Sequence, residues 1–197
     1  MSLDKRKLRG QYILLGCGII TSSAIYALSC FIAPAFRRIC LPFVPATTAQ
    51  IDSIANILET VQRTESHHSL GTLVDLGSGD GRVLIDLLRR PQLHFENAVG
   101  IDLNRPLVWY SRWNGRRVGM KRPLLTFKHG NLWTTDLSKY KTIVLFGVDC
   151  MMEKFEDKVK QEVLPNTFVL TCRFPLPRTS PEVCIDEGPD SVYFYRF

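Results

Sequence analysis

The sequence lacks the cysteine and histidine spacings that hold metal ions in proteins. Its six cysteines and four histidines form no CxxC, CxH or HxxxH pattern, and structural zinc sites are built from ligands at such short spacings. We therefore expect no metal centre. Widely spaced cysteines are instead typical of a reducing compartment in which the thiols are buried; they are Cys17, Cys30, Cys40, Cys150, Cys172 and Cys184.

The larger part of the sequence also lacks a marked net charge. Residues 1–40 contain six Lys and Arg against one acid, whereas residues 41–197 contain nineteen against eighteen. Most of the formal charge of +6 therefore belongs to the first forty residues. Because nucleic-acid binding is usually carried by a basic domain, this balance argues against a nucleic-acid partner.

Charged residues are absent altogether from Gly10 to Phe36. The apolar stretch Tyr12–Ala33 would form a helix about 33 Å long, which matches the hydrocarbon core of a bilayer. We interpret residues 1–40 as a membrane anchor, with a targeting sequence or a buried core helix as the alternatives. The two prolines of LPFVPATTAQ then mark the start of a globular domain, residues 41–197.

Helical and strand patterns alternate within this domain. Apolar residues recur at helical spacing or in short buried runs. Helices are expected at residues 48–63, 81–90, 105–119 and 153–164, and strands at 72–76, 98–102, 124–130, 142–148 and 167–174. This alternation predicts an α/β fold, a Rossmann-like, doubly wound and mostly parallel sheet covered on both faces. The final segments, 182–187 and 191–197, are expected to form an antiparallel hairpin at one edge.

The segment VDLGSGDGR carries the most informative motif. Gly77, Gly79 and Gly81 follow the first predicted strand and open the next helix, where backbone N–H groups of a doubly wound sheet bind ligands. A dinucleotide site needs GxGxxG, whereas here the third glycine comes one residue earlier. Asp102 ends the second predicted strand, and a carboxylate at that place accepts hydrogen bonds from the two hydroxyls of a ribose. Loop and carboxylate together predict a nucleoside-containing cofactor.

The order Asp75-x-Gly77-x-Gly79-x-Gly81 resembles the first motif of the class I methyltransferases, which bind S-adenosylmethionine. Further segments narrow the resemblance: PFVPATTAQ, LNRPLVWYSRW, NLW, FGVDCMMEKFEDKV and CRFPLP. Together they are similar to the small membrane-associated mitochondrial lysine methyltransferases that modify the ATP synthase c-subunit or the adenine nucleotide translocase. FVPAT and VLFGV make the c-subunit branch the nearer one. The resemblance covers roughly residues 41–178 and implies methylation of a membrane-protein lysine, first of all in the c-subunit, at the mitochondrial inner membrane.

The motif and the resemblance together give the expected cofactor-binding residues. Two positions depart from the family pattern, because Asn131 stands where an acid precedes LW and Asp149 stands in place of a proline. The amide oxygen of Asn131 can still accept a hydrogen bond from the adenine amino group. The expected cofactor-binding residues are Asp75, Gly77, Ser78, Gly79, Gly81, Asp102, Leu103, Asn131 and Leu132.

Three acids are the candidate catalytic residues. Methyl transfer needs a neutral lysine amine, and neutralising a free lysine at pH 7 costs about 4.6 kcal/mol. Desolvation beside the cationic sulfonium, or a nearby proton acceptor, must offset that cost. Asp80 in the glycine loop and Asp149 and Glu153 after the fourth predicted strand are placed to orient the amine or accept its proton. The alternative role of Asp80 is to cap the next helix. The alternative for Asp149 and Glu153 is that they are ordinary solvated acids.

Aromatic and basic residues share the segment 105–122. Trp109, Tyr110 and Trp113 are expected chiefly in the core, with an aromatic wall for the cofactor or the lysine as the alternative. The basic residues form an acid-free run that is expected to be a solvated helix face, with contact to anionic lipid as the alternative. They are Arg105, Arg112, Arg116, Arg117, Lys121 and Arg122.

Three other functions stay open at this point. An RNA or small-molecule methyltransferase is compatible with the same fold, because a fold does not fix a substrate. A cofactor-binding or assembly protein that has lost catalysis would explain the departures at Asn131 and Asp149. A nicotinamide enzyme is disfavoured by the spacing of the loop glycines.

Overall fold

The computed structural model describes residues 17–19, 21–23, 25–26, 45–64, 69–120 and 123–197. The chain divides into two units, Met1–Pro42 and Phe43–Phe197. Among the described residues, no helix is both long and apolar enough to cross a membrane. Most of the expected anchor and the expected boundary at residue 41 lie outside the described residues. Both therefore stay predictions.

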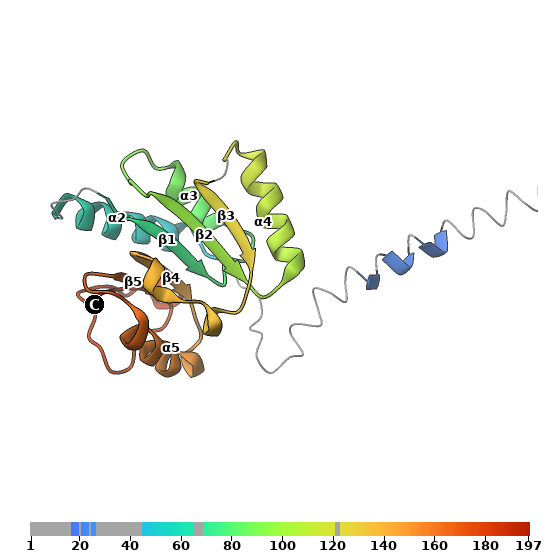
Figure 1. Cartoon of the computed structure of the whole chain (residues 1–197). Coiled ribbons are helices and arrows are strands. Elements are labelled where there is room, and N and C mark those ends of the chain that lie inside the picture. Colours follow the sequence, from blue (N-terminus) through green and yellow to red (C-terminus); the bar gives the residue numbers. More distant parts are fainter. Residues whose placement is uncertain (1–16, 20, 24, 27–44, 65–68, 121–122) are drawn as a thin grey trace, which may run out of the picture. The chain divides into compact units, whose positions relative to one another are not determined.

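The second unit is built on one seven-stranded sheet (Figure 1). The strands are β1 (Thr72–Leu76), β2 (Asn97–Asp102), β3 (Leu125–His129), β4 (Thr142–Phe146), β5 (Phe168–Cys172), β6 (Val183–Ile185) and β7 (Val192–Arg196). Their order is β3-β2-β1-β4-β5-β7-β6. The first five strands are parallel, whereas β7 runs antiparallel to both β5 and β6. The expected parallel sheet with an antiparallel edge hairpin is confirmed.

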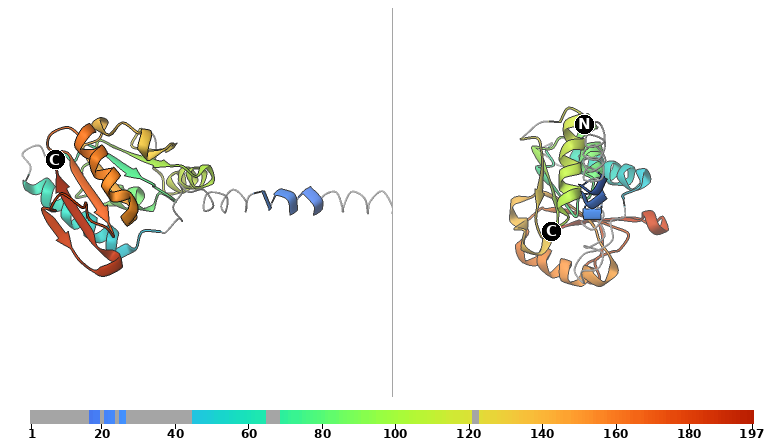
Figure 2. Two further views of the ribbon diagram at one scale, coloured as in Figure 1. Left: turned by 90° about the horizontal axis from the view of Figure 1, so that it is seen from below. Right: turned by 90° about the vertical axis from the view of Figure 1, so that its right-hand side faces the viewer.

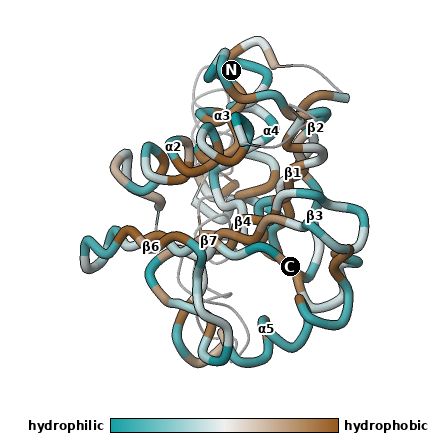
Figure 3. Tube along the Cα trace, turned by 90° about the vertical axis from the view of Figure 1, so that its left-hand side faces the viewer, coloured by the Kyte–Doolittle hydropathy of each residue, from teal (hydrophilic) through white to brown (hydrophobic). Residues whose placement is uncertain are grey.

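Helices cover both faces of this sheet (Figures 1 and 2). They are α2 (Thr48–Thr64), α3 (Arg82–Arg89), α4 (Arg105–Arg117) and α5 (Asp149–Glu162), with short 3-10 helices η2 (Leu132–Thr134), η3 (Leu137–Lys139) and η4 (Gly188–Asp190). Side chains of α2, α3 and α4 share one buried cluster with Leu73, and those of α5 share another with Val74. Successive residues of β1 thus serve opposite faces, as the pleat requires. In Figure 3 the strands are largely hydrophobic, whereas α5 carries long hydrophilic stretches.

The expected start of the last helix and the expected burial of all the cysteines are wrong. Helix α5 begins at Asp149, one turn before the expected start at Glu153, and an acid in the first turn suits the positive end of a helix dipole. The cysteines are not all buried: Cys172 is buried on β5, but Cys17, Cys150 and Cys184 are exposed. Cys150 lies on the exposed side of the first turn of α5, and Cys184 lies on the short edge strand β6. At neither position does another helix or strand cover the side chain.

Candidate active site

The carboxyl ends of β1 and β4 mark the point where the order of the parallel strands reverses. From β1 the sheet continues to β2 and β3, and from β4 it continues to β5. Ligands of doubly wound sheets bind beyond such a switch point. The glycine loop follows β1, and the amino end of α5 follows β4. The sequence-predicted residues therefore gather at one edge of the sheet.

The glycine loop turns sharply under the end of β2. The backbone N–H groups of Gly77 and Ser78 both donate to the carbonyl oxygen of Ile101, at 2.8 and 3.0 Å. Gly77 has a φ of 87°, and a Cβ there would meet no atom within 4 Å, so the loop faces open space at this residue. Gly81, with a φ of 80°, is needed for a different reason, because a Cβ there would clash with the ring of Phe127.

Asp102 fastens the loop to the end of β2. Its two carboxylate oxygens accept hydrogen bonds from the backbone N–H groups of Gly79, at 2.8 Å, and Asn104, at 2.7 Å. Burial raises the pKa of Asp102, and these two hydrogen bonds oppose the rise. Each carboxylate oxygen has a second lone pair, so the same group can also accept from ribose hydroxyls.

Asp75 and Ser78 are the buried polar residues of this site that lack partners. Among the described residues, Asp75 Oδ1 and Ser78 Oγ are the buried side-chain oxygens without a hydrogen bond. Desolvation, with smaller contributions from the charges of Asp102 and Asp80, raises the pKa of Asp75 to about 8. Unpaired buried polar atoms are costly. Their presence at the loop indicates a place prepared for a polar ligand.

Asp80 is held by the residue that opens α3. The Nε and Nη2 atoms of Arg82 donate to Asp80 Oδ2 at 2.8 and 2.7 Å, and the backbone N–H of Arg82 donates to Asp80 Oδ1 at 3.2 Å. The amide of Asn114 on α4 lies 3.5 Å from the carbonyl oxygen of Asp80. These bonds resemble the capping alternative, while the proposed contact with the substrate amine stays a prediction.

The residues that follow β2 and β3 lie side by side. The Gly130 backbone N–H donates to the Asp102 carbonyl oxygen at 3.0 Å, and His129 Nε2 lies 3.1 Å from the carbonyl oxygen of Leu103. Asn131 opens η2, and its Oδ1 accepts the backbone N–H of Trp133 at 3.0 Å. This bond fixes the amide orientation beside the expected cofactor position. Leu103 is exposed and Leu132 half-buried.

Asp149 and Glu153 lie at the start of α5, on the same edge as the glycine loop. Both are exposed, Asp149 in the first turn and Glu153 one turn further. Glu153 pairs with Arg178 at 4.0 Å. Asp149 is thus the acid nearer to the carboxyl end of β4. Their contact with substrate stays a prediction.

A fully buried acid, Glu156, was missed by the sequence analysis. Its carboxylate accepts from Lys160 Nζ and Thr179 Oγ1, both at 2.6 Å, and from the backbone N–H of Arg178 at 3.0 Å. Although desolvation opposes the effect, these hydrogen bonds lower the pKa of Glu156 to about 2. Glu156 therefore ties the segment after CRFPLP to α5. Its partners Arg178 and Thr179 lie more than twenty positions away in the sequence, and they left no local pattern to detect.

The expected burial of the α4 aromatic residues is wrong. Trp109, Tyr110 and Trp113 are 69%, 47% and 52% exposed. The core face of α4 is formed by Leu107, Val108 and other small or apolar side chains. The three rings stand on the opposite side.

The residues at this edge fit S-adenosylmethionine. Asp102 is placed for the ribose, Asp75 Oδ1 and Ser78 Oγ lack donors or acceptors that a ligand would supply, and the open space at Gly77 leaves room for one. Together with strand order β3-β2-β1-β4-β5-β7-β6, they define a class I methyltransferase that uses S-adenosylmethionine.

Comparison with known proteins gives the family. The chain belongs to the family of the ANTKMT methyltransferase domain, whose model matches residues 75–183. A human relative, named as the lysine N-methyltransferase of the ATP synthase c-subunit, is 39% identical over 185 residues, which cover 93% of this chain and 74% of the relative. The mouse adenine nucleotide translocase lysine N-methyltransferase is 30% identical, over 87% of this chain and 72% of the relative.

A solved structure agrees with the fold and with the cofactor. The crystal structure of an RNA methyltransferase from Salinibacter ruber in complex with S-adenosyl-L-homocysteine has a TM-score of 0.65 and 28% sequence identity. The match covers 78% of this chain and 93% of that chain. S-adenosyl-L-homocysteine is the product that remains after S-adenosylmethionine has given up its methyl group.

Proposed function

We propose that this chain is an S-adenosylmethionine-dependent protein-lysine N-methyltransferase whose substrate is the c-subunit of ATP synthase. The observation that carries the proposal is the similarity to the named c-subunit methyltransferases, which extends over almost the whole chain rather than over the cofactor motif alone. The weaker similarity to the translocase methyltransferase keeps that substrate as the second candidate.

The cofactor supplies an electrophilic methyl group on a cationic sulfonium, and the chain's own residues do the rest. Asp102 and the backbone of the glycine loop bind and orient the nucleoside. The lysine amine must arrive without its proton, which costs about 4.6 kcal/mol at pH 7 for a free lysine. Proximity to the sulfonium charge lowers the pKa of the amine. Asp80 and Asp149 are the acids at this edge that can orient it or accept its proton.

A membrane location belongs to the same proposal. The supporting features are the uncharged stretch Gly10–Phe36, the basic residues on both of its sides, and a substrate that is a subunit of a membrane enzyme. We infer that residues 1–40 anchor the chain at the mitochondrial inner membrane. Fractionation of mitochondria that carry the tagged full chain tests this: extraction by alkaline carbonate would contradict a membrane-spanning anchor.

The test of activity is transfer of a labelled methyl group. The full chain is incubated with labelled S-adenosylmethionine and, in parallel, with the purified c-subunit, the adenine nucleotide translocase and total RNA. We expect label on a lysine of the c-subunit, located by mass spectrometry. Label on RNA alone would overturn the proposal in favour of the activity named for the Salinibacter relative.

Two variants control this assay. Asp102→Ala removes the carboxylate that holds Gly79 and is expected to abolish labelling. Glu96→Gln changes an exposed acid after α3 and is expected to leave labelling unchanged. Cofactor binding by the wild type, measured by calorimetry, without transfer to any of the three substrates would favour a protein that has lost catalysis.

A further inference from the structure

The segment between Asp102 and Asp136 contains no acid. Its 33 residues include seven Lys and Arg. Because residues 41–197 have nineteen basic residues against eighteen acids, the rest of the domain has a net charge of −6. The charge balance of the whole domain therefore hides a strong separation: one continuous segment, from the end of β2 to η2, is basic.

Much of this charge lies on the outer side of α4 together with the exposed aromatic rings. Arg105, Trp109, Trp113 and Arg117 follow one another at four-residue intervals, so they form one row along the helix. The guanidinium of Arg117 lies 5.4 Å from the centre of the Trp113 ring, and the Tyr110 and Trp113 rings lie 5.7 Å apart. Within residues 105–117 the structure shows no ion pair. This row is both apolar and cationic.

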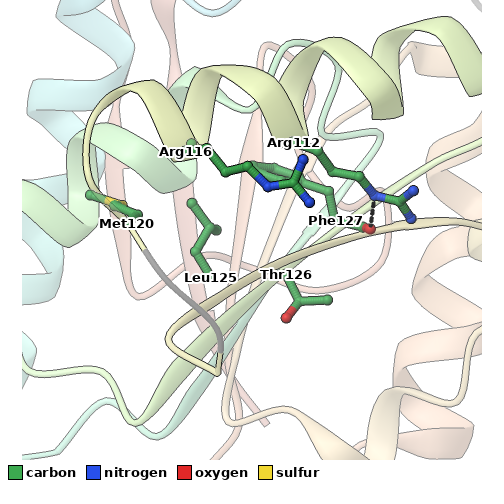
Figure 4. A pocket seen from close by; sticks show the side chains of 7 residues that line it. Arg112, Arg116, Met120, Leu125, Thr126 and Phe127 are labelled. Carbon is green, nitrogen blue, oxygen red and sulfur yellow. Dashed lines mark hydrogen bonds between the residues drawn. The ribbon is translucent and has the colours of Figure 1, made fainter.

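A hollow with two further arginines lies beside the row, between α4 and β3 (Figure 4). Its volume is about 230 Å³, and Arg112 and Arg116 lie over Leu125 and Thr126. Arg112 Nε donates to the carbonyl oxygen of Phe127 at 2.9 Å, which leaves its terminal nitrogens to other acceptors. Guanidinium groups with free donors bind phosphate oxygens in bidentate fashion.

We propose that this face of α4, defined by Arg105, Trp109, Trp113, Arg116 and Arg117, lies on the headgroup region of an anionic lipid bilayer. Indole rings are amphipathic and settle at the headgroup level of membranes. Arginines beside them attract anionic lipids and pair with their phosphates. A helix with basic residues and tryptophans on one face is typical of interfacial membrane binding.

The position of α4 connects this contact with the active site. The helix begins at the Asn104 cap, directly after Asp102, and its Asn114 contacts Asp80 in the glycine loop. Arg82, the partner of Asp80, also donates to the carbonyl oxygen of Ala46 at 3.4 Å, close to where the domain begins. Lipid contact through α4 therefore brings the cofactor edge near the bilayer. The idea that lipid contact helps the enzyme to reach a membrane-embedded lysine rests on the proposed function. The lipid contact itself does not rest on it.

Bound RNA is the competing occupant of a basic and aromatic surface. Proteins that bind single-stranded nucleic acid stack bases on aromatic rings inside a positively charged groove. Here the rings stand on the outer side of a helix, where Trp113 is already in contact with Arg117 and Tyr110. The exposed side of a helix therefore matches a flat lipid surface better than it matches single-stranded RNA.

The test uses the tryptophans as built-in depth probes. The chain has three, Trp109 and Trp113 on α4 and Trp133 in η2. Trp133 packs with the buried cluster on the α5 face of the sheet, and Lys154 lies 4.4 Å from its ring centre. Trp133→Phe thus leaves fluorescence from α4 alone, and the double variant Trp109→Phe, Trp113→Phe leaves fluorescence from Trp133 alone, as the matched control.

The full chain is mixed with vesicles of phosphatidylcholine, with or without phosphatidylserine, that contain brominated phosphatidylcholine as quencher. We expect strong quenching of the Trp133→Phe variant with phosphatidylserine vesicles and little quenching of the double variant. Adding Arg116→Gln and Arg117→Gln to Trp133→Phe should weaken the quenching by α4. Adding Arg63→Gln and Arg89→Gln, two exposed arginines of α2 and α3 with the same total charge, should not.

Three results would overturn the proposal. They are equal quenching of Trp133 and the α4 tryptophans, no association of the full chain with phosphatidylserine vesicles, and an α4 fluorescence change with RNA but not with lipid. None of these readouts depends on methyl transfer. Failure of the lipid contact is therefore distinguishable from failure of the proposed enzyme activity.

Discussion

Replacing Asp75 by asparagine should make the ligand-free protein less sensitive to rising pH. The carboxyl is buried and its Oδ1 has no partner. Desolvation, then the charges of Asp102 and Asp80, raise its pKa from 3.8 to about 8. From about pH 4 to about pH 8 the unfolded chain loses this proton while the folded chain keeps it, so the free energy of unfolding falls as pH rises. An asparagine has no such proton.

The size of the effect follows from the shift. Each pKa unit corresponds to about 1.4 kcal/mol, so a rise of about four units is an upper limit on the order of 5 kcal/mol across the whole window. The asparagine also leaves an amide without partners, which costs about 1 to 3 kcal/mol at every pH. The slope of the stability difference against pH, rather than its value at one pH, therefore isolates the carboxyl.

The assay is urea unfolding of the full chain, without cofactor, followed by tryptophan fluorescence from about pH 5 to about pH 8. We expect the stability of Asp75→Asn relative to wild type to rise by about 1.4 kcal/mol or less per pH unit. Glu96→Gln, which replaces an exposed carboxylate, is the matched control for the loss of one acid. Parallel curves for Asp75→Asn and wild type would refute the reasoning, because they would mean that the buried carboxyl titrates normally.

Four further substitutions test the site and its support. Asp102→Ala should abolish binding of S-adenosylmethionine in calorimetry, because the ribose carboxylate and the loop contact are lost together; unchanged affinity would contradict the assignment. Gly77→Ala should cost about 1 to 2 kcal/mol in thermal unfolding through its positive φ, and Gly81→Ala more, because its methyl group also meets Phe127; the reverse order would be evidence against the described loop. The wild type gains stability from the Glu156 carboxylate above about pH 4.5 and loses it as the pH falls towards 2, and Glu156→Gln should remove about 3 kcal/mol or less of this stability. Acid unfolding curves of the variant and the wild type that coincide would refute this.

The fold was largely predictable because its signals are local. Strands β1, β2, β4 and β5 are short, mostly apolar and buried runs that end in a polar or glycine-containing segment, and such runs in alternation with helices admit few topologies. The start of α5 was misplaced because the expected helix began at Glu153, although Met151 and Met152 before it are already buried residues of the helix. Asp149 and Glu153 consequently lie on one helix, one turn apart, rather than on a loop and a helix.

The candidate site was predictable only where its residues lie at or just after the carboxyl ends of predicted strands. Asp75, the loop glycines and Asp102 occupy such positions, and these have fixed roles at a switch point. The clamp at Glu156 depends on Arg178 and Thr179, more than twenty residues away. No local pattern records a partner at that distance, so the acid resembled the other charged residues of α5.

The error on α4 has a physical cause that bears on function. If only the free energy gained by burying apolar surface is considered, an aromatic helix face predicts a core position. Helix α4 instead buries Val108, Ser111 and Gly115. Gly115 lets the helix approach β3 closely, since a Cβ there would lie 3.2 Å from Leu125. Large rings on that side would hold the helix away from the sheet. Close packing therefore requires small residues inside and leaves Trp109 and Trp113 outside, in one row with Arg105 and Arg117, where they are available for the proposed contact with anionic lipid.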